Sequence, residues 1–156
     1  MSKAYFAAGC FWGVQQRFSK LAGVTNTTVG YMGGTMDDPD YRSVCTGQTG
    51  HAEVVEVEYN PAQVDFSTLI SCFFEWHDPT QVNRQGPDIG TQYRTAIFPQ
   101  NEEQRIEAQH KIDQLNQSGY YSQPIATTIE TADTFWPAED YHQHYLDKRG
   151  LGHCGI

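Results

Sequence analysis

The residues most able to do chemistry stand in one short segment, Gly9-Cys10-Phe11-Trp12-Gly13, between an expected strand and an expected helix. A thiol at a helix N-terminus lies at the positive end of the helix dipole, which favours the thiolate and lowers the thiol pKa. Phe11 and Trp12 place apolar surface beside that thiol. The segment is typical of a nucleophilic cysteine, but its position alone leaves open that Cys10 is a small buried hydrophobe.

The other three cysteines, Cys45, Cys72 and Cys154, form no CxxC pair. Four thiols in 156 residues are too few for a disulfide scaffold, and their spacing is not that of a zinc site. We therefore expect a reducing compartment and one or two chemically active thiols. Cys72 precedes Phe73 on the apolar side of an expected helix and is expected to pack in the core.

Hydrophobic periodicity predicts the elements that must position these residues. Strands are expected over residues 3–8, 24–31, 54–59, 93–98 and 125–130, with long loops over 32–50 and 77–90. Helices are expected from near Cys10 to before Gly23, after a cap at Asp65, between Asn101 and Gly119, and over 138–146. Ile106, Ile112 and Leu115 are expected to face inward from the third helix.

This order of elements predicts an α+β protein, a two-layer sandwich on a mixed sheet with a split βαβ (ferredoxin-like) core. Residues 1–156 are long enough for a single domain. Residues 149–156 include three glycines and are expected to form a mobile C-terminal tail that carries Cys154.

The composition supports a compact core and limits the partners. The chain is 38% hydrophobic and 13% aromatic, and its net charge is −9. That charge argues against nucleic-acid binding, disfavours anionic membranes and opposes a thiolate, so any lowering of the Cys10 pKa must be local. No apolar run approaches the roughly 18–20 residues of a membrane span. The first residues lack the pattern of a secretory signal, so a cytoplasmic location is expected.

Further segments follow Gly9–Gly13 in order along the chain. They are GYMGG (30–34), YRSVCTG (41–47), TGHAE (49–53), HDPT (77–80), RQGPD (84–88), GTQYR (90–94) and AEDYHQ (138–143). Together with the Cys-Gly near the end, they resemble the peptide methionine sulfoxide reductase A family over nearly the whole chain. The resemblance implies a catalytic domain that reduces the S epimer of methionine sulfoxide, free or in proteins, to methionine.

The resemblance also implies roles on the oxygen side of the substrate. Cys10 would be the nucleophile that attacks the sulfoxide sulfur, and Glu53 would be the acid that protonates the oxygen. Tyr41 and Tyr93 would donate hydrogen bonds to the oxygen, with Asp88 as support. A glutamic acid holds its proton near neutral pH only in a desolvated pocket, where its pKa is raised.

On the apolar side, Phe11 and Trp12 would form the slot for the substrate methyl group. Attack leaves Cys10 as a sulfenic acid, which Cys154 would convert to a disulfide for reduction by a thioredoxin-type dithiol. Several family members carry two recycling cysteines in a longer tail, whereas this chain has one beyond Cys72. Cys45 is expected to be structural. No metal and no organic cofactor are implied.

Several of these residues also have ordinary structural interpretations. Glu53 could begin a strand as a solvated carboxylate, Tyr41 and Tyr93 could be half-buried tyrosines, and Asp88 could cap a turn before Gly90. The residues alone leave these interpretations open.

Three histidines invite further interpretations. His142 and His144 suggest a metal site, but residues two apart on a helix point to different faces, so we do not favour it. His142 and Glu139 are expected to serve packing or a hydrogen-bond network. A backbone-binding role for His51 stays open.

Two other functions compete with the reductase. A thiol peroxidase would give no reason for the paired tyrosines and Glu53. A module that only binds oxidised methionine would keep Phe11 and Trp12 but would not need Cys154. A monomer is the default expectation for the oligomeric state.

Overall fold

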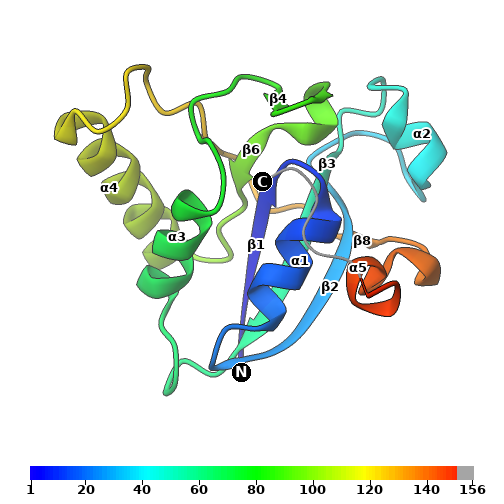
Figure 1. Ribbon diagram of the computed structural model, residues 1–156, viewed down its shortest axis with the longest axis horizontal. Helices are drawn as coiled ribbons and strands as arrows, with labels where there is room; N and C mark the ends of the chain where they lie inside the picture. The colour runs from blue at the N-terminus through cyan, green and yellow to red at the C-terminus, as the bar shows by residue number, and fades with distance from the viewer. Residues whose placement is uncertain (151–156) are drawn as a thin grey trace.

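A six-stranded mixed sheet forms the centre of the computed structural model, which describes residues 1–150 (Figure 1). The strand order is β7-β6-β1-β3-β2-β8, and every neighbouring pair is antiparallel except β6 and β7. The strands are β1 (Ser2–Ala8), β2 (Val24–Met32), β3 (Ala52–Tyr59), β6 (Thr95–Ile97), β7 (Thr128–Ile129) and β8 (Trp136–Pro137). The predicted α+β class and mixed sheet are confirmed; Cys154 lies outside the described residues.

Five α-helices occur in the described part of the chain. They are α1 (Phe11–Ser19), α2 (Tyr41–Cys45), α3 (Phe66–Glu75), α4 (Glu102–Ser118) and α5 (Tyr145–Lys148). Helices α1 and α3 pack on the central strands, and α4 lies beyond α3 (Figure 1). Figure 1 shows the short helices α2 and α5 on the side of the molecule away from α4, with α5 beside β2 and β8 and α2 apart from it.

Polar caps fix the ends of the long helices where the sequence predicted them. The Asp65 carboxylate accepts a hydrogen bond from the Thr68 N–H at 2.8 Å, and the Asn101 side chain accepts one from the Gln104 N–H at 2.9 Å. Gly119 closes α4 in the left-handed conformation, with φ of 73°. The local signals for these helix ends are therefore confirmed.

The core lies on both faces of the sheet because successive side chains of a strand point to opposite faces. On the side of the sheet that α1 and α3 cover, the centroid of the Phe6 ring lies 5.0 Å from that of Phe18 and 5.1 Å from that of Phe73. On the opposite face, Tyr5 and its neighbours form a smaller cluster against Phe135. Strand β1 is thus buried on both faces, as its uninterrupted apolar sequence predicts.

The two predicted long loops contain short elements that the hydrophobic pattern did not indicate. Residues 32–50 include α2, which begins with a capping box: the Asp40 carboxylate accepts from the Ser43 N–H, and the Ser43 hydroxyl accepts from the Asp40 N–H. Residues 77–90 include a small hairpin of β4 (Arg84–Gln85) and β5 (Asp88–Ile89). Polar capping, rather than apolar periodicity, defines α2.

Four other predictions need correction. Tyr93 lies in the 3₁₀ turn η1 (Thr91–Tyr93) before β6, and the strand expected over 125–130 is only β7.

The helix expected over 138–146 is divided into the 3₁₀ turn η2 (Asp140–His142) and α5, because His144 has a left-handed backbone with φ of 53°. Ile106 is 55% exposed and does not face inward, whereas Ile112 faces the core as predicted, on the same side of α4 as Gln104 and Ala108.

No helix among residues 1–150 has the length and apolar character needed to cross a membrane.

Gly30 is required where β8 pairs with β2. A Cβ atom there would lie 2.4 Å from the Trp136 carbonyl oxygen and 2.5 Å from the Phe135 ring. We expect Gly30→Ala to lower the free energy of unfolding by about 1–3 kcal/mol, because a packed backbone crossing must shift. Urea unfolding measures this, with the exposed Gln117→Ala on α4 as a control that changes little. Unchanged stability of the Gly30 variant would contradict a tight crossing.

Candidate active site

Cys10 is the N-cap residue of α1, and only Gly9 separates it from the end of β1. Gly9 makes the sharp turn between the two elements with φ of 85°, a conformation that favours glycine. Cys10 is partly exposed, so a reaction partner can reach its thiol. The predicted strand-to-helix junction is confirmed, with the thiol at the positive end of the helix dipole.

Glu53 lies directly beneath this junction, on the central strand β3. Its Oε1 atom accepts a hydrogen bond from the Phe11 N–H at 3.1 Å, so a carboxyl oxygen takes one of the free N–H groups of the helix N-terminus. Glu53 is only 2% exposed. Its alternative interpretation as a solvated carboxylate at the start of a strand is therefore wrong.

Tyr41 and Tyr93 reach the same site from two different segments, α2 and η1. Burial raises the pKa of both phenols well above the ordinary value, and the nearby charge of Glu53 raises it further. Both hydroxyls therefore keep their protons and stay hydrogen-bond donors across the neutral range.

Asp88 approaches from β5, beside Tyr93. The charge of Asp88 contributes to the raised pKa of Tyr93, and partial burial raises the pKa of Asp88 itself. The charge of Cys10 acts on Tyr93 as well. The structure thus brings together Cys10, Glu53, Tyr41, Tyr93 and Asp88, whose segments are widely separated in the chain.

Cys45 belongs to this cluster, although the sequence indicated only a structural role. The hydroxyls of Tyr41 and Tyr93 act to lower the pKa of its thiol, but partial burial outweighs them and the pKa is raised. Tyr41 and Cys45 are four residues apart and share a face of α2, so recognition of the Asp40 capping box would have placed Cys45 at the site.

Aromatic rings line the other side of Cys10. Phe11 is buried and packs 5.7 Å from the Tyr31 ring and 6.4 Å from the Tyr41 ring. Trp12 is half-buried and stacks on Tyr145 of α5 with 3.9 Å between ring centroids and 9° between planes. The predicted apolar surface is therefore present beside the thiol.

Glu139 ties the segments of the site together, in the hydrogen-bond network expected for it. Its Oε1 accepts from the Tyr31 hydroxyl at 2.9 Å, and its Oε2 accepts from the Tyr41 N–H at 3.1 Å and the Tyr141 hydroxyl at 3.3 Å. Burial alone would raise the pKa of Glu139, but backbone N–H groups and the Tyr31 hydroxyl outweigh it and lower the pKa. The ionised carboxylate fixes the first residue of α2.

The histidines singled out in the sequence serve the frame of the site. His51 is buried; its Nδ1 accepts from the Gly34 N–H at 3.0 Å and its Nε2 bonds the Met36 carbonyl at 2.7 Å. His51 therefore binds the backbone of its own chain. His142 Nδ1 accepts from the Trp12 indole N–H at 3.0 Å, whereas His144 donates its backbone N–H to Gln15 Oε1 at 2.7 Å.

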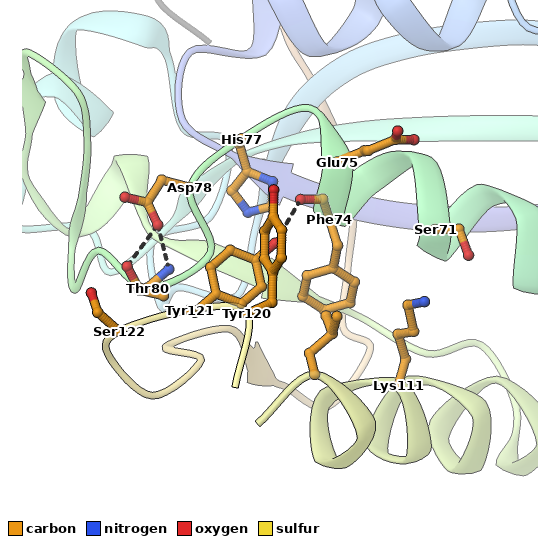
Figure 2. A pocket seen from close by; sticks show the side chains of 11 residues that line it. Ser71, Phe74, Glu75, His77, Asp78, Thr80, Lys111, Tyr120, Tyr121 and Ser122 are labelled. Carbon is orange, nitrogen blue, oxygen red and sulfur yellow. Dashed lines mark hydrogen bonds between the residues drawn. The ribbon is translucent and has the colours of Figure 1, made fainter. Parts of the chain in front are cut away.

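A cavity of about 770 Å³ lies elsewhere, between α3, α4 and the segments 77–80 and 120–122 (Figure 2). None of the predicted site residues lines it. The imidazole of His77 in its wall bonds the Phe73 carbonyl and the Thr95 hydroxyl, and burial lowers its pKa to about 4. This neutral histidine, with both ring nitrogens bonded, is part of the core.

An accessible thiol at a helix N-terminus, a buried carboxyl beneath it and two permanently protonated phenols define a cysteine-dependent enzyme on an α+β fold. The family model for peptide methionine sulfoxide reductase matches residues 2–156. The chain is 54% identical to the peptide methionine sulfoxide reductase MsrA of Methanoculleus marisnigri, over 99% of this chain and 94% of that protein. It is also 54% identical to the one of Acidobacterium capsulatum, over the full length of both.

Solved structures agree with this result. The structure of methionine sulfoxide reductase A of Corynebacterium diphtheriae has a TM-score of 0.83 and 40% identity, covering 97% of this chain and 76% of that one. The reduced form of Mxr1 from Saccharomyces cerevisiae has a TM-score of 0.90 and 38% identity, covering 99% and 88%. The chain belongs to the peptide methionine sulfoxide reductase family, as an oxidoreductase of the MsrA type.

We expect Glu139→Gln to lower the free energy of unfolding at pH 7 by about 1–3 kcal/mol. The amide N–H₂ would replace one carboxylate oxygen and would then face a donor, either the Tyr31 hydroxyl or the Tyr41 N–H. The folded-state pKa of Glu139 is lowered, so the carboxylate stabilises the protein above the ordinary glutamate range and loses this effect as the pH falls through the lowered pKa. As the pH falls below the ordinary glutamate range toward this lowered pKa, the stabilities of the two proteins should therefore approach each other.

Urea unfolding of both proteins from pH 7 to pH 3 measures this difference. Glu107→Gln, an exposed charge on α4, is the matched control and should change little. A difference between wild type and Glu139→Gln that stays constant with pH would contradict the stabilising role of the carboxylate.

Proposed function

We propose that the chain reduces the S epimer of methionine sulfoxide, free or in proteins, by attack of the Cys10 thiolate on the sulfoxide sulfur. One observation carries the proposal: Cys10 shares its site with the buried Glu53 and the phenols of Tyr41 and Tyr93. A thiol peroxidase would give no reason for the apolar surface of Phe11 and Trp12 beside these donors, and a module that only binds would give no reason for a nucleophile.

The chemistry follows from the weak leaving ability of the sulfoxide oxygen. Glu53 acts as the acid that protonates this oxygen, while Tyr41 and Tyr93 donate hydrogen bonds to it as its negative charge grows. In net terms, the oxygen passes from the sulfoxide to Cys10. Methionine leaves, and Cys10 remains as a sulfenic acid. Asp88 supports the oxygen side from beside Tyr93.

The two sides of the site give the reaction its stereochemistry. Phe11 and Trp12 form an apolar slot that takes the methyl group, and the phenols take the oxygen. Once the methyl group and the oxygen are placed, the two epimers differ in which way the rest of the methionine side chain and the sulfur lone pair point. Only one epimer directs the side chain out of the site. One epimer is therefore reduced.

Regeneration uses a second thiol. The Cys10 sulfenic acid condenses with the Cys154 thiol to give a disulfide and water, and a thioredoxin-type dithiol then reduces that disulfide. A solved structure of yeast Mxr1 in complex with Trx2 supports such a partner. It is 26% identical to this chain, with a TM-score of 0.63 and coverage of 92% of this chain.

We also infer that residues 1–156 are one catalytic domain on a split βαβ core of the ferredoxin-like type; most of the expected tail, 149–156, lies outside the described residues. Support for the core comes from the sheet: β3 separates β1 from β2, and β6 flanks β1, with each neighbouring pair antiparallel. A monomer and a cytoplasmic location stay predictions.

Turnover of each epimer tests the reaction and its nucleophile. With dithiothreitol as reductant, the protein should release methionine from the S epimer only. Cys10→Ser should release none above background, because no sulfenic acid can form. Cys72→Ser removes a thiol outside the site and should retain wild-type rates, which makes it the matched control. Release from the R epimer, or an active Cys10→Ser protein, would refute the proposal.

Removal of the phenolic hydroxyls tests the oxygen side. Tyr41→Phe and Tyr93→Phe should each lower kcat about tenfold, and the double variant about 10²–10³-fold, because the donors act on charge that develops in the transition state. KM should change little. Tyr121→Phe, whose hydroxyl contacts the Phe74 carbonyl at 3.5 Å, is the control. A double variant with wild-type kcat would exclude this role.

A further inference from the structure

His142 is held against Trp12 in one defined state. The ring is 2% exposed, and its Nδ1 lies 3.0 Å from the Trp12 Nε1. An indole N–H only donates, so Nδ1 accepts and the ring proton stands on Nε2. Burial lowers the pKa of His142 although the charge of Glu139 opposes this, so the ring is neutral at pH 7.

Stability alone does not explain a histidine at this position. Its ring packs against three aromatic rings, with centroid-to-centroid distances of 4.2 Å to Tyr141, 4.4 Å to Tyr41 and 5.5 Å to Phe11. The buried Nε2 has no hydrogen-bond partner within the described part of the chain. A buried donor without an acceptor is unfavourable, and an apolar side chain of similar size would avoid it.

Trp12 needs a constraint that its ring stacking does not supply. Tyr145 stacks on the indole with 3.9 Å between centroids and 9° between planes, which sets the plane of the ring. Parallel stacking has little preference for rotation within that plane. A directional hydrogen bond at the indole edge fixes this rotation, and His142 Nδ1 supplies it.

We propose that His142 is a positioning residue that fixes the in-plane orientation of Trp12 and thereby the shape of the substrate slot. The inference rests on the proposed function, which places Trp12 in the wall of that slot. The slot contacts the substrate methyl group in the ground state and the transition state alike. Loss of the orientation therefore raises KM and leaves kcat nearly unchanged.

Three substitutions separate the acceptor from the bulk of the side chain. His142→Leu removes the acceptor and should raise KM for the S epimer about three- to tenfold, the effect of one neutral hydrogen bond. His142→Asn keeps an acceptor oxygen near the Nδ1 position and should stay close to wild type. His142→Gln carries its amide near the Nε2 position and should resemble the leucine variant.

A double-mutant cycle with Trp12→Phe then shows whether the effect passes through the indole. Trp12→Phe alone should raise KM, and adding His142→Leu to it should change nothing more. The indole emission attributable to Trp12, taken as wild type minus Trp12→Phe, should shift in His142→Leu but not in His142→Asn. Thermal midpoints of all variants are recorded alongside.

Each outcome decides between the roles. If His142→Leu raises KM equally in both backgrounds, or if Asn and Gln are equally impaired, His142 does not act through Trp12 and the proposal is overturned. An unchanged KM in His142→Leu overturns it too. If Trp12→Phe itself leaves KM unchanged, the slot assignment of the proposed function fails instead. Should His142→Leu not fold, the Asn and Gln pair still gives the answer.

Discussion

The hydrogen bond from the Phe11 N–H to the Glu53 carboxyl joins the two parts of the structure on which the site depends. It links the first residue of α1 to the central strand β3, and so holds the thiol of Cys10 and the buried acid in one rigid unit. Strand β3 itself is paired on both sides, with β1 and β2. Cys10 and Glu53, the proposed nucleophile and acid, therefore stand at the centre of the sheet and at the start of its first helix, where backbone pairing sets their separation.

Polar side chains also hold the segment after β8 against this unit. The Gln143 amide accepts from the Val29 N–H and donates to the Val29 carbonyl, both at 2.9 Å, as a neighbouring strand would. The Gln15 side chain accepts the His144 N–H, and the Gln16 amide donates to Asp147 at 3.1 Å. These bonds hold the segment that carries Glu139 and the ring stacked on Trp12 against β2 and α1.

The sequence predicted the central elements because each has a local signal. The apolar run of β1, the alternation of β3 and the caps Asp65 and Asn101 all act within one element. What it did not predict depends on contacts between distant segments. Neither α2 nor the break at His144 is encoded by apolar periodicity: the first depends on Asp40 and Ser43 and the second on the bonds to α1. Cys45 was expected to be only structural for the same reason, since its place at the site follows from α2.

The proposed nucleophile and the proposed hydrogen-bond donors come from different kinds of structural element. Cys10 and Glu53 must stay in fixed register, and they come from the sheet and its first helix. Tyr41 comes from the short helix α2 and Tyr93 from the 3₁₀ turn η1, both outside the central sheet. Their burial beside Glu53 keeps both phenols protonated, so these two short elements need only deliver donors and not tune an acid. In the proposed mechanism the nucleophile is fixed in the fold, and the hydrogen-bond donors reach it from short segments around it. This arrangement suits a substrate that is a side chain of another protein, because the reacting sulfur enters the site while its polypeptide stays outside.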